Sequence, residues 1–218
     1  LPVAAHAADA EAATHLHSNS VPQALALMVA FALGGIAFLA DSSAALAAAA
    51  LVGAVYLYCQ ARIVSASKGI PAWRHPAIIP ALLSMGLAEG AGVAMILAPG
   101  QGAILFVLLV ALRFALWRRY LKRLSADGAP IGTLSAFASS LFIYMVTGHA
   151  LPILFAGAGL WLDNPLVLGL AGFLAVGAGW WMKLILITKA AYNQGFALPR
   201  VPVRGQGTPG ETVKPGWL

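Results

Sequence analysis

The stretch AIIPALLSMGLAEGAGVAMILAP, residues Ala77 to Pro99, contains a single charged residue, Glu89, near its centre. A run of this length and polarity predicts a transmembrane helix, because about 20 mainly apolar residues cross the hydrocarbon core of a bilayer. A carboxylate at that depth costs roughly 2.5–3.5 kcal/mol on insertion scales, and such residues usually face protein or a water-filled path. We therefore expect Glu89 to handle protons or a ligand, the alternative being an acid kept neutral by burial and bonded to a neighbouring helix.

The rest of the chain repeats this pattern. Apolar runs also cover residues 22–40, 44–61, 102–117, 131–160 and 166–187, and 61% of the 218 residues are hydrophobic while 9% are charged. Soluble domains carry about 25% charged residues. We predict an all-α, polytopic transmembrane helix bundle of about six helices. The fifth run is longer than a straight crossing needs, so we expect it to tilt or bend, with Pro152 as the bend.

The two ends of the chain differ from this helical domain. We predict an N-terminal tail over residues 1–20, the transmembrane domain over 21–190 and an extended tail over 191–218. The last segment is rich in Pro and Gly and has neither a helical nor a strand period. Its recurring apolar residues favour an extended segment docked on a partner, and a mobile end is the alternative.

The basic residues predict the topology. All 13 end or follow the second, fourth and sixth runs, and the connections around Asp41, Pro99 and Asp163 have none. By the positive-inside rule, the basic loops and the C-terminus should be cytoplasmic in a bacterial or archaeal cytoplasmic membrane. This pattern explains the net charge of +6 without a nucleic-acid partner. Arg113 is counted in this set, and four tryptophans are expected near the two membrane interfaces: Trp117, Trp161, Trp180 and Trp181.

Further polar residues could line a site within the bundle. His149 lies near the middle of the fifth run, after Tyr144, and an imidazole titrates near neutral pH and can bond a quinone carbonyl. Tyr56 and Gln60 are four residues apart and so share one helix face, where they line a pocket mouth or anchor the helix at the interface. The candidate quinone or proton residues are therefore Glu89, His149, Tyr56, Gln60 and Tyr144. Packing alone is the alternative for the histidine.

Two blocks of sequence resemble a known family. YCQARIVSASKGIPAWRHPAIIPALLSMGLAEGAG, residues 58–92, resembles the middle of the membrane anchor subunit of DMSO-reductase-type molybdenum or tungsten iron–sulfur oxidoreductases, which is related to the polysulfide reductase membrane subunit. KLILITKAAYNQGFALPRVPVRG, residues 183–205, is similar to the C-terminal signature of the phenylacetyl-CoA:acceptor oxidoreductase type of anchor. The first block shows a helix ending in tyrosine and arginine, an I-P-x-W loop and a Pro-rich helix start.

The resemblance implies a non-catalytic anchor without a cofactor chain of its own. It would exchange electrons between membrane quinone, either ubiquinone or menaquinone, and the [4Fe–4S] clusters of a docked iron–sulfur subunit. That subunit would connect to a catalytic subunit with a molybdenum or tungsten bis-pterin centre. Candidate docking residues are Trp73, Arg74, Tyr192, Asn193, Phe196, Arg200 and Arg204. The only cysteine, Cys59, excludes a cysteine-ligated cluster within this chain alone, so we expect no metal site in it.

We hypothesise that quinone lies between the second, third and fifth helices, beneath the docked cluster. Two alternatives stay open. One is a small proton-coupled transporter or channel that uses Glu89 and His149, and the other is a structural tether without a quinone site.

Overall fold

The computed structural model describes residues 22–67 and 69–192, and the regular structure in this part of the chain is helical throughout. The elements in chain order are a helix over Pro22–Ala40, α2 (Ser43–Ser65), α3 (Pro71–Arg74), α4 (Ile78–Leu97), α5 (Ala103–Ala126), α6 (Ile131–Met145), the π-helical turn η1 (Val146–Ala150), α7 (Leu151–Trp161) and α8 (Pro165–Thr188). The all-α prediction is confirmed for these residues.

Five helices are long and apolar enough to cross a membrane. They are Pro22–Ala40, α2, α4, the continuous helix Ile131–Trp161 and α8. The helix α5 lies beside α4 and is as long as α8, but it carries more charge, including Arg113, Arg118 and Arg119. The chain is therefore a multi-pass membrane protein, and a sixth crossing by α5 stays a prediction.

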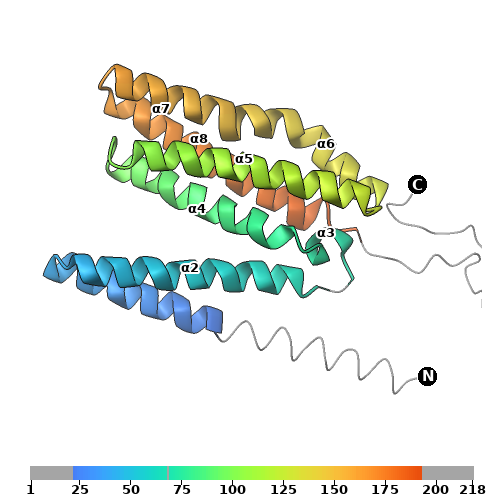
Figure 1. Cartoon of the computed structure of the whole chain (residues 1–218), viewed down its shortest axis with the longest axis horizontal. Helices are drawn as coiled ribbons and strands as arrows, with labels where there is room; N and C mark the ends of the chain where they lie inside the picture. Colours follow the sequence, from blue (N-terminus) through green and yellow to red (C-terminus); the bar gives the residue numbers. More distant parts are fainter. Residues whose placement is uncertain (1–21, 68, 193–218) are drawn as a thin grey trace, which may run out of the picture.

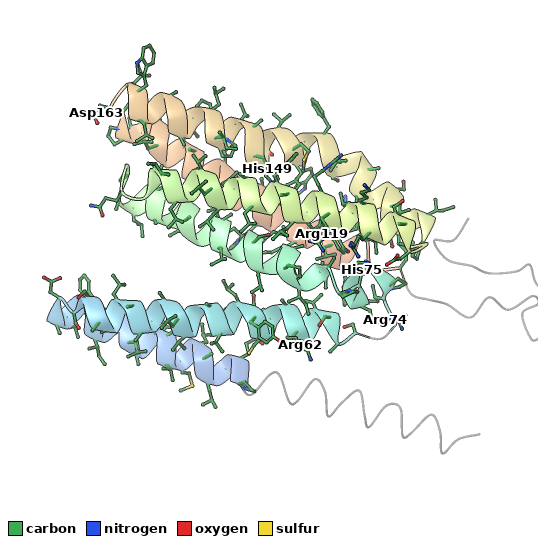
Figure 2. The ribbon with its side chains drawn as sticks, viewed as in Figure 1. Arg62, Arg74, His75, Arg119, His149 and Asp163 are labelled. Carbon is green, nitrogen blue, oxygen red and sulfur yellow. The ribbon has the colours of Figure 1, made fainter. Side chains whose placement is uncertain are left out.

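The connections gather at two opposite ends of the bundle (Figure 1). The turns around Asp41, Pro99 and Asp163 lie at one end. The described parts of the connection between α2 and α4 (66–67 and 69–77) and the connection 127–130 lie at the other, which we call the basic end. Figure 2 shows Asp163 far from Arg62, Arg74 and Arg119, which gather towards the basic end. The loop charges are thus segregated as the positive-inside rule requires, while the assignment of the basic end to the cytoplasm stays a prediction.

The helix α4 lies at the centre of the packing and contacts α5, α8 and α2. Small residues permit these contacts, as they do in many membrane helix pairs. A Cβ atom added at Gly92 would lie 2.9 Å from the Gly172 carbonyl oxygen of α8, and one added at Gly86 would lie 2.7 Å from a methyl carbon of Leu57 on α2. Close approach of α4 and α8 therefore depends on glycine at position 92, where the neighbouring atom is backbone, whereas at Gly86 the Leu57 side chain could shift.

The long fifth run contains a π-helical turn, η1, immediately before α7. Pro152 has no N–H, so the carbonyl of Gly148, four residues earlier, has no α-helical donor. The guanidinium of Arg113 on α5 donates a hydrogen bond to that carbonyl instead. The irregularity expected near Pro152 is therefore a widened turn whose free carbonyl is bonded by another helix.

At the basic end, the I-P-A-W segment forms the short helix α3 rather than a loop. The indole Nε1 of Trp73 donates to the Leu186 carbonyl oxygen of α8 at 3.0 Å. The hydroxyl of Tyr120 on α5 donates to the Ala72 carbonyl oxygen at 2.8 Å. These two bonds fix α3 across the ends of α5 and α8.

His75 connects the same segment to the end of α5. Its Nε2 lies 2.9 Å from Oδ2 of Asp127, and its Nδ1 accepts a hydrogen bond from the Ala77 backbone N–H at 3.1 Å. His75 is buried, so it fixes the chain entry into α4 rather than presenting an exposed loop side chain.

Candidate functional site

Glu89 lies in the core of the bundle, where 9% of its surface is exposed. Its Oε2 accepts a hydrogen bond from the ammonium of Lys183 on α8 at 2.6 Å. The sequence pattern groups Lys183 with the basic residues that mark the end of the sixth run, but the structure turns it inward to this ion pair. An opposite charge in direct contact lowers the cost of holding a carboxylate at membrane depth.

The space for the Glu89 side chain comes from α8. A Cβ atom added at Gly179 would lie 3.0 Å from the Glu89 carboxyl carbon and still closer to its Oε1. Gly90, next to Glu89 in sequence, faces open space, and Gly86 accommodates α2 instead. The glycine that accommodates the acid is therefore on the partner helix.

An apolar cavity of about 230 Å³ adjoins the ion pair. It lies between the helix Pro22–Ala40, α2, α4 and α8. Its lining residues are Gln23, Leu57, Gln60, Ala61, Ile63, Val64, Leu82, Lys183, Leu186 and Ile187. No residue of the fifth run is among them, so the cavity does not lie between the second, third and fifth helices as hypothesised. The reason is the packing order, because α8 rather than α6 or α7 lies beside α4 on this side.

Gln60 lines this cavity, and Tyr56 lies about one turn earlier on α2. The Gln60 amide donates a hydrogen bond to the Tyr56 hydroxyl at 2.8 Å, and Gln60 itself lines the cavity. The two residues therefore share a helix face, and the Tyr56 hydroxyl orients the Gln60 amide.

Arg113 was predicted to lie among the basic residues at a helix end, and this prediction is wrong. It is fully buried, and its guanidinium donates to the Ala175 carbonyl oxygen at 2.8 Å and to the Gly148 carbonyl oxygen. Two signals in the sequence could have indicated a buried arginine. One is its position ten residues into α5, well before Arg118 and Arg119, and the other is the carbonyl that Pro152 leaves without a donor. Neither signal identifies the helices to which Arg113 bonds, and these are known only from the tertiary structure.

His149 and Tyr144 come together beside this arginine. Their rings lie 4.8 Å apart in an edge-on arrangement, and His149 Nδ1 lies 3.2 Å from the Tyr144 carbonyl oxygen. Phe114 of α5 covers the imidazole from another side, with ring centroids 5.5 Å apart. Figure 2 shows His149 within the bundle, away from both ends. The histidine thus bonds within its own helix, whereas Glu89 bonds to α8.

Trp117 lies inside the bundle rather than on its lipid-facing surface, and its expected depth near a membrane interface stays a prediction. Trp117 is fully buried and packs against Tyr120, Phe137 and Tyr144. An aromatic residue within an arginine-rich segment indicates an interface by composition alone, but this side of α5 faces inward.

The candidate docking residues lie partly outside the described residues. Trp73 is half-buried and bonded to Leu186, as above, whereas Arg74 beside it is exposed. The Tyr192 ring packs closely over Gly132 of α6. The tails 1–20 and 193–218 lie outside the described residues, and so do four candidates: Asn193, Phe196, Arg200 and Arg204.

Among the residues that the structure describes, no group of three or more His, Cys, Asp or Glu side chains is placed to hold a metal ion. Comparison of the chain with protein-family models, curated proteins and solved structures gives no match. The functional interpretation therefore rests on the geometry above and on the two sequence blocks, 58–92 and 183–205.

Proposed function

We propose that this chain is the membrane anchor subunit of a multi-subunit molybdenum or tungsten oxidoreductase. It exchanges electrons between membrane quinone or quinol and the [4Fe–4S] chain of a docked iron–sulfur subunit. The observation that carries this proposal is that Lys183 both lines an apolar cavity and pairs with the buried Glu89.

The cavity suits the chemistry of a quinone head group. Such a head is an apolar ring with two carbonyl acceptors, so it needs apolar walls and a few donors. Leu57, Leu82 and Leu186 supply apolar walls, while the Gln60 amide and the Lys183 ammonium supply donors. The volume is below the roughly 300–1,000 Å³ of drug-sized pockets, which fits one ring whose isoprenoid tail lies in lipid.

A bound quinone supplies two-electron, two-proton chemistry, and this chain supplies position and proton partners. Lys183 lines the cavity, and its ammonium donates a hydrogen bond to Glu89 Oε2. A proton can thus pass between the cavity wall and the carboxylate within one hydrogen bond. Gln60, bonded to Tyr56, offers its second amide N–H to the ring from α2.

The basic end supports the docking part of the proposal. It combines α3, fixed by Trp73, with exposed Arg74 and with the start of the C-terminal tail. We propose that the iron–sulfur subunit binds here, on the cytoplasmic side, and that the tail lies extended against it.

The proposal is tested with Glu89→Gln in the purified complex. The amide keeps the size of the side chain but cannot take up and release a proton, and it carries no charge to pair with the Lys183 ammonium. Quinone-linked turnover should fall at least tenfold, the equivalent of about 1.4 kcal/mol, while dye-linked activity of the catalytic subunit stays intact. Ser139→Ala, on the outside of α6, is the matched control and should change neither rate. Unchanged quinone-linked turnover in Glu89→Gln would remove this acid from the mechanism.

Two further measurements separate the alternatives. An anchor should copurify with an iron–sulfur protein and show no transport when reconstituted alone, whereas a proton-coupled transporter should acidify vesicles without partners. A structural tether should bind no quinone in a fluorescence-quenching titration of the purified chain.

A further inference from the structure

Five buried polar atoms have no hydrogen-bond partner among the described residues. They are Glu89 Oε1, Arg113 Nε, Trp117 Nε1, Tyr144 Oη and His149 Nε2. In native proteins roughly 90% or more of buried polar groups are bonded to protein or to ordered water. That all five fall within one region of the bundle calls for a common explanation.

Four of the five atoms belong to side chains around one tyrosine. The Tyr144 ring lies 5.8 Å from the Arg113 guanidinium carbon, 5.8 Å from the Trp117 ring and 4.8 Å from the His149 ring, measured to ring centroids. These side chains come from α5, α6 and η1. The side chains of Arg113, Trp117 and His149 therefore all lie against the Tyr144 ring.

Glu89 joins this group along α8. Its carboxylate lies against Gly179, and Arg113 bonds to the carbonyl of Ala175. Four residues separate these two positions, so they are about one turn apart on the same face of α8, a rise of roughly 6 Å. The Gly148 backbone of η1 packs on Ala178 of this same face. The acid, the guanidinium and the histidine segment thus surround one stretch of α8.

The mixture of donors and acceptors identifies the ligand class. The Glu89 oxygen only accepts, the Arg113 and Trp117 nitrogens only donate, and the Tyr144 hydroxyl does both. A bound cation would leave the N–H donors without an acceptor, and a bound anion would be repelled by the Glu89 carboxylate. Water both donates and accepts, and buried waters typically make two to four bonds to groups of this kind.

We propose that buried water fills a polar chamber bounded by α4, α5, α6, η1 and α8, and that this water moves protons between Glu89 and His149. The chamber itself is independent of the proposed function. Its role as a proton reservoir for the quinone cavity rests on that function, through the Lys183–Glu89 pair. A quinol in the cavity gives a proton to Glu89 through Lys183; the proton then leaves Oε1 along water and the Tyr144 hydroxyl to His149 Nε2, and no covalent bond besides those to the proton changes.

A matched pair of tyrosines tests the chamber. Tyr120 and Tyr144 are both fully buried, but the Tyr120 hydroxyl is bonded to the Ala72 carbonyl and that of Tyr144 has no partner among the described residues. Hydroxyl-radical footprinting with X-ray pulses oxidises side chains beside bound water even where bulk solvent is excluded. In the purified full chain in lipid nanodiscs, Tyr144 should be oxidised several-fold faster than Tyr120. Equal and low rates for both would overturn the chamber.

The relay is tested on the purified complex with Tyr144→Phe, which removes one hydroxyl and keeps the ring. Quinone affinity should stay unchanged while quinone-linked turnover falls several-fold, because the site is intact and proton movement is slowed. Tyr58→Phe, on the exposed side of α2, should change neither quantity. Unchanged turnover in Tyr144→Phe would overturn the relay. If that variant fails to fold, His149→Asn takes its place with the same expectations.

The two proposals fail in different ways. Absence of quinone binding by the wild-type chain refutes the proposed function but leaves the footprinting contrast intact. Equal labelling of the two tyrosines refutes the chamber and leaves quinone binding untouched.

Discussion

Replacing Gly179 by alanine should separate Glu89 from its place against α8. The added Cβ would lie 3.0 Å from the carboxyl carbon and 3.1 Å from Cγ of Glu89, tighter than ordinary van der Waals contact. The carboxylate has little freedom to yield, because the Lys183 ammonium holds its other oxygen at 2.6 Å. Either the ion pair shifts or α4 and α8 move apart.

The expected loss follows from these contacts. Overpacking a well-packed core costs about 1–3 kcal/mol, and an alanine in a helix gains about 1 kcal/mol over glycine. If the carboxylate leaves its partner, breaking a buried pair adds up to roughly 3–5 kcal/mol, less here because Lys183 is partly exposed. We expect a net loss of about 1–3 kcal/mol, dominated by the disturbed pair.

The assay is unfolding of the purified chain by SDS in mixed micelles, followed by helical circular dichroism. Gly177→Ala on the same helix is the matched control, since a Cβ there meets nothing within 4 Å. It should be neutral or stabilising. In a Glu89→Ala background, Gly179→Ala should behave like the control, because the obstructing carboxylate is gone. Equal stabilities of Gly179→Ala and Gly177→Ala would refute the position we assign to Glu89.

Other contacts give further predictions. Arg113→Met should lower the stability of the chain by about 2–4 kcal/mol, because two charged hydrogen bonds to carbonyls are lost. The loss should be smaller in a Pro152→Ala background, since the new N–H of residue 152 replaces one of these bonds. Equal losses in both backgrounds, measured by the same SDS titration, would argue that Arg113 does not bond the carbonyl freed by Pro152. Trp73→Phe should cost about 1 kcal/mol and loosen α3, seen as faster proteolysis between α2 and α4, and protection equal to wild type would contradict the bond to α8. His75→Gln should cost about 1–2 kcal/mol through its contacts with Asp127 and the start of α4; thermal unfolding tests this, and an unchanged midpoint would count against it.

The predicted helices and the observed ones agree closely in place. The run 44–61 becomes Ser43–Ser65, the run 166–187 becomes Pro165–Thr188, and the run 102–117 extends as far as Ala126. The last extension has a clear cause, because arginine and lysine are good helix formers that an apolar count discards. Hydrophobic length therefore locates helices well and underestimates the ones with charged ends.

The hydrogen-bond partners of the buried polar residues could not be predicted from the sequence. Glu89 could be recognised as buried because a lone charge inside a 23-residue apolar run is too costly to leave facing lipid. Its counter-charge could not be identified, since Lys183 is 94 positions away and resembles an ordinary helix-end lysine. Arg113 shows the same limit, because its partners are backbone carbonyls, which leave no trace in the residue types.

Taken alone, the amino-acid order determined that this is a multi-pass helical membrane protein with basic loops at one end and an acid at membrane depth. Local properties decide such features: run length, helix-breaking proline and the cost of placing charge in lipid. Only the tertiary structure decided that α8, and not the histidine-bearing helix, faces Glu89 and closes the apolar cavity. Helix order in a bundle is set by which small faces fit together, as Gly92 fits Gly172, and that complementarity exists only between two packed surfaces.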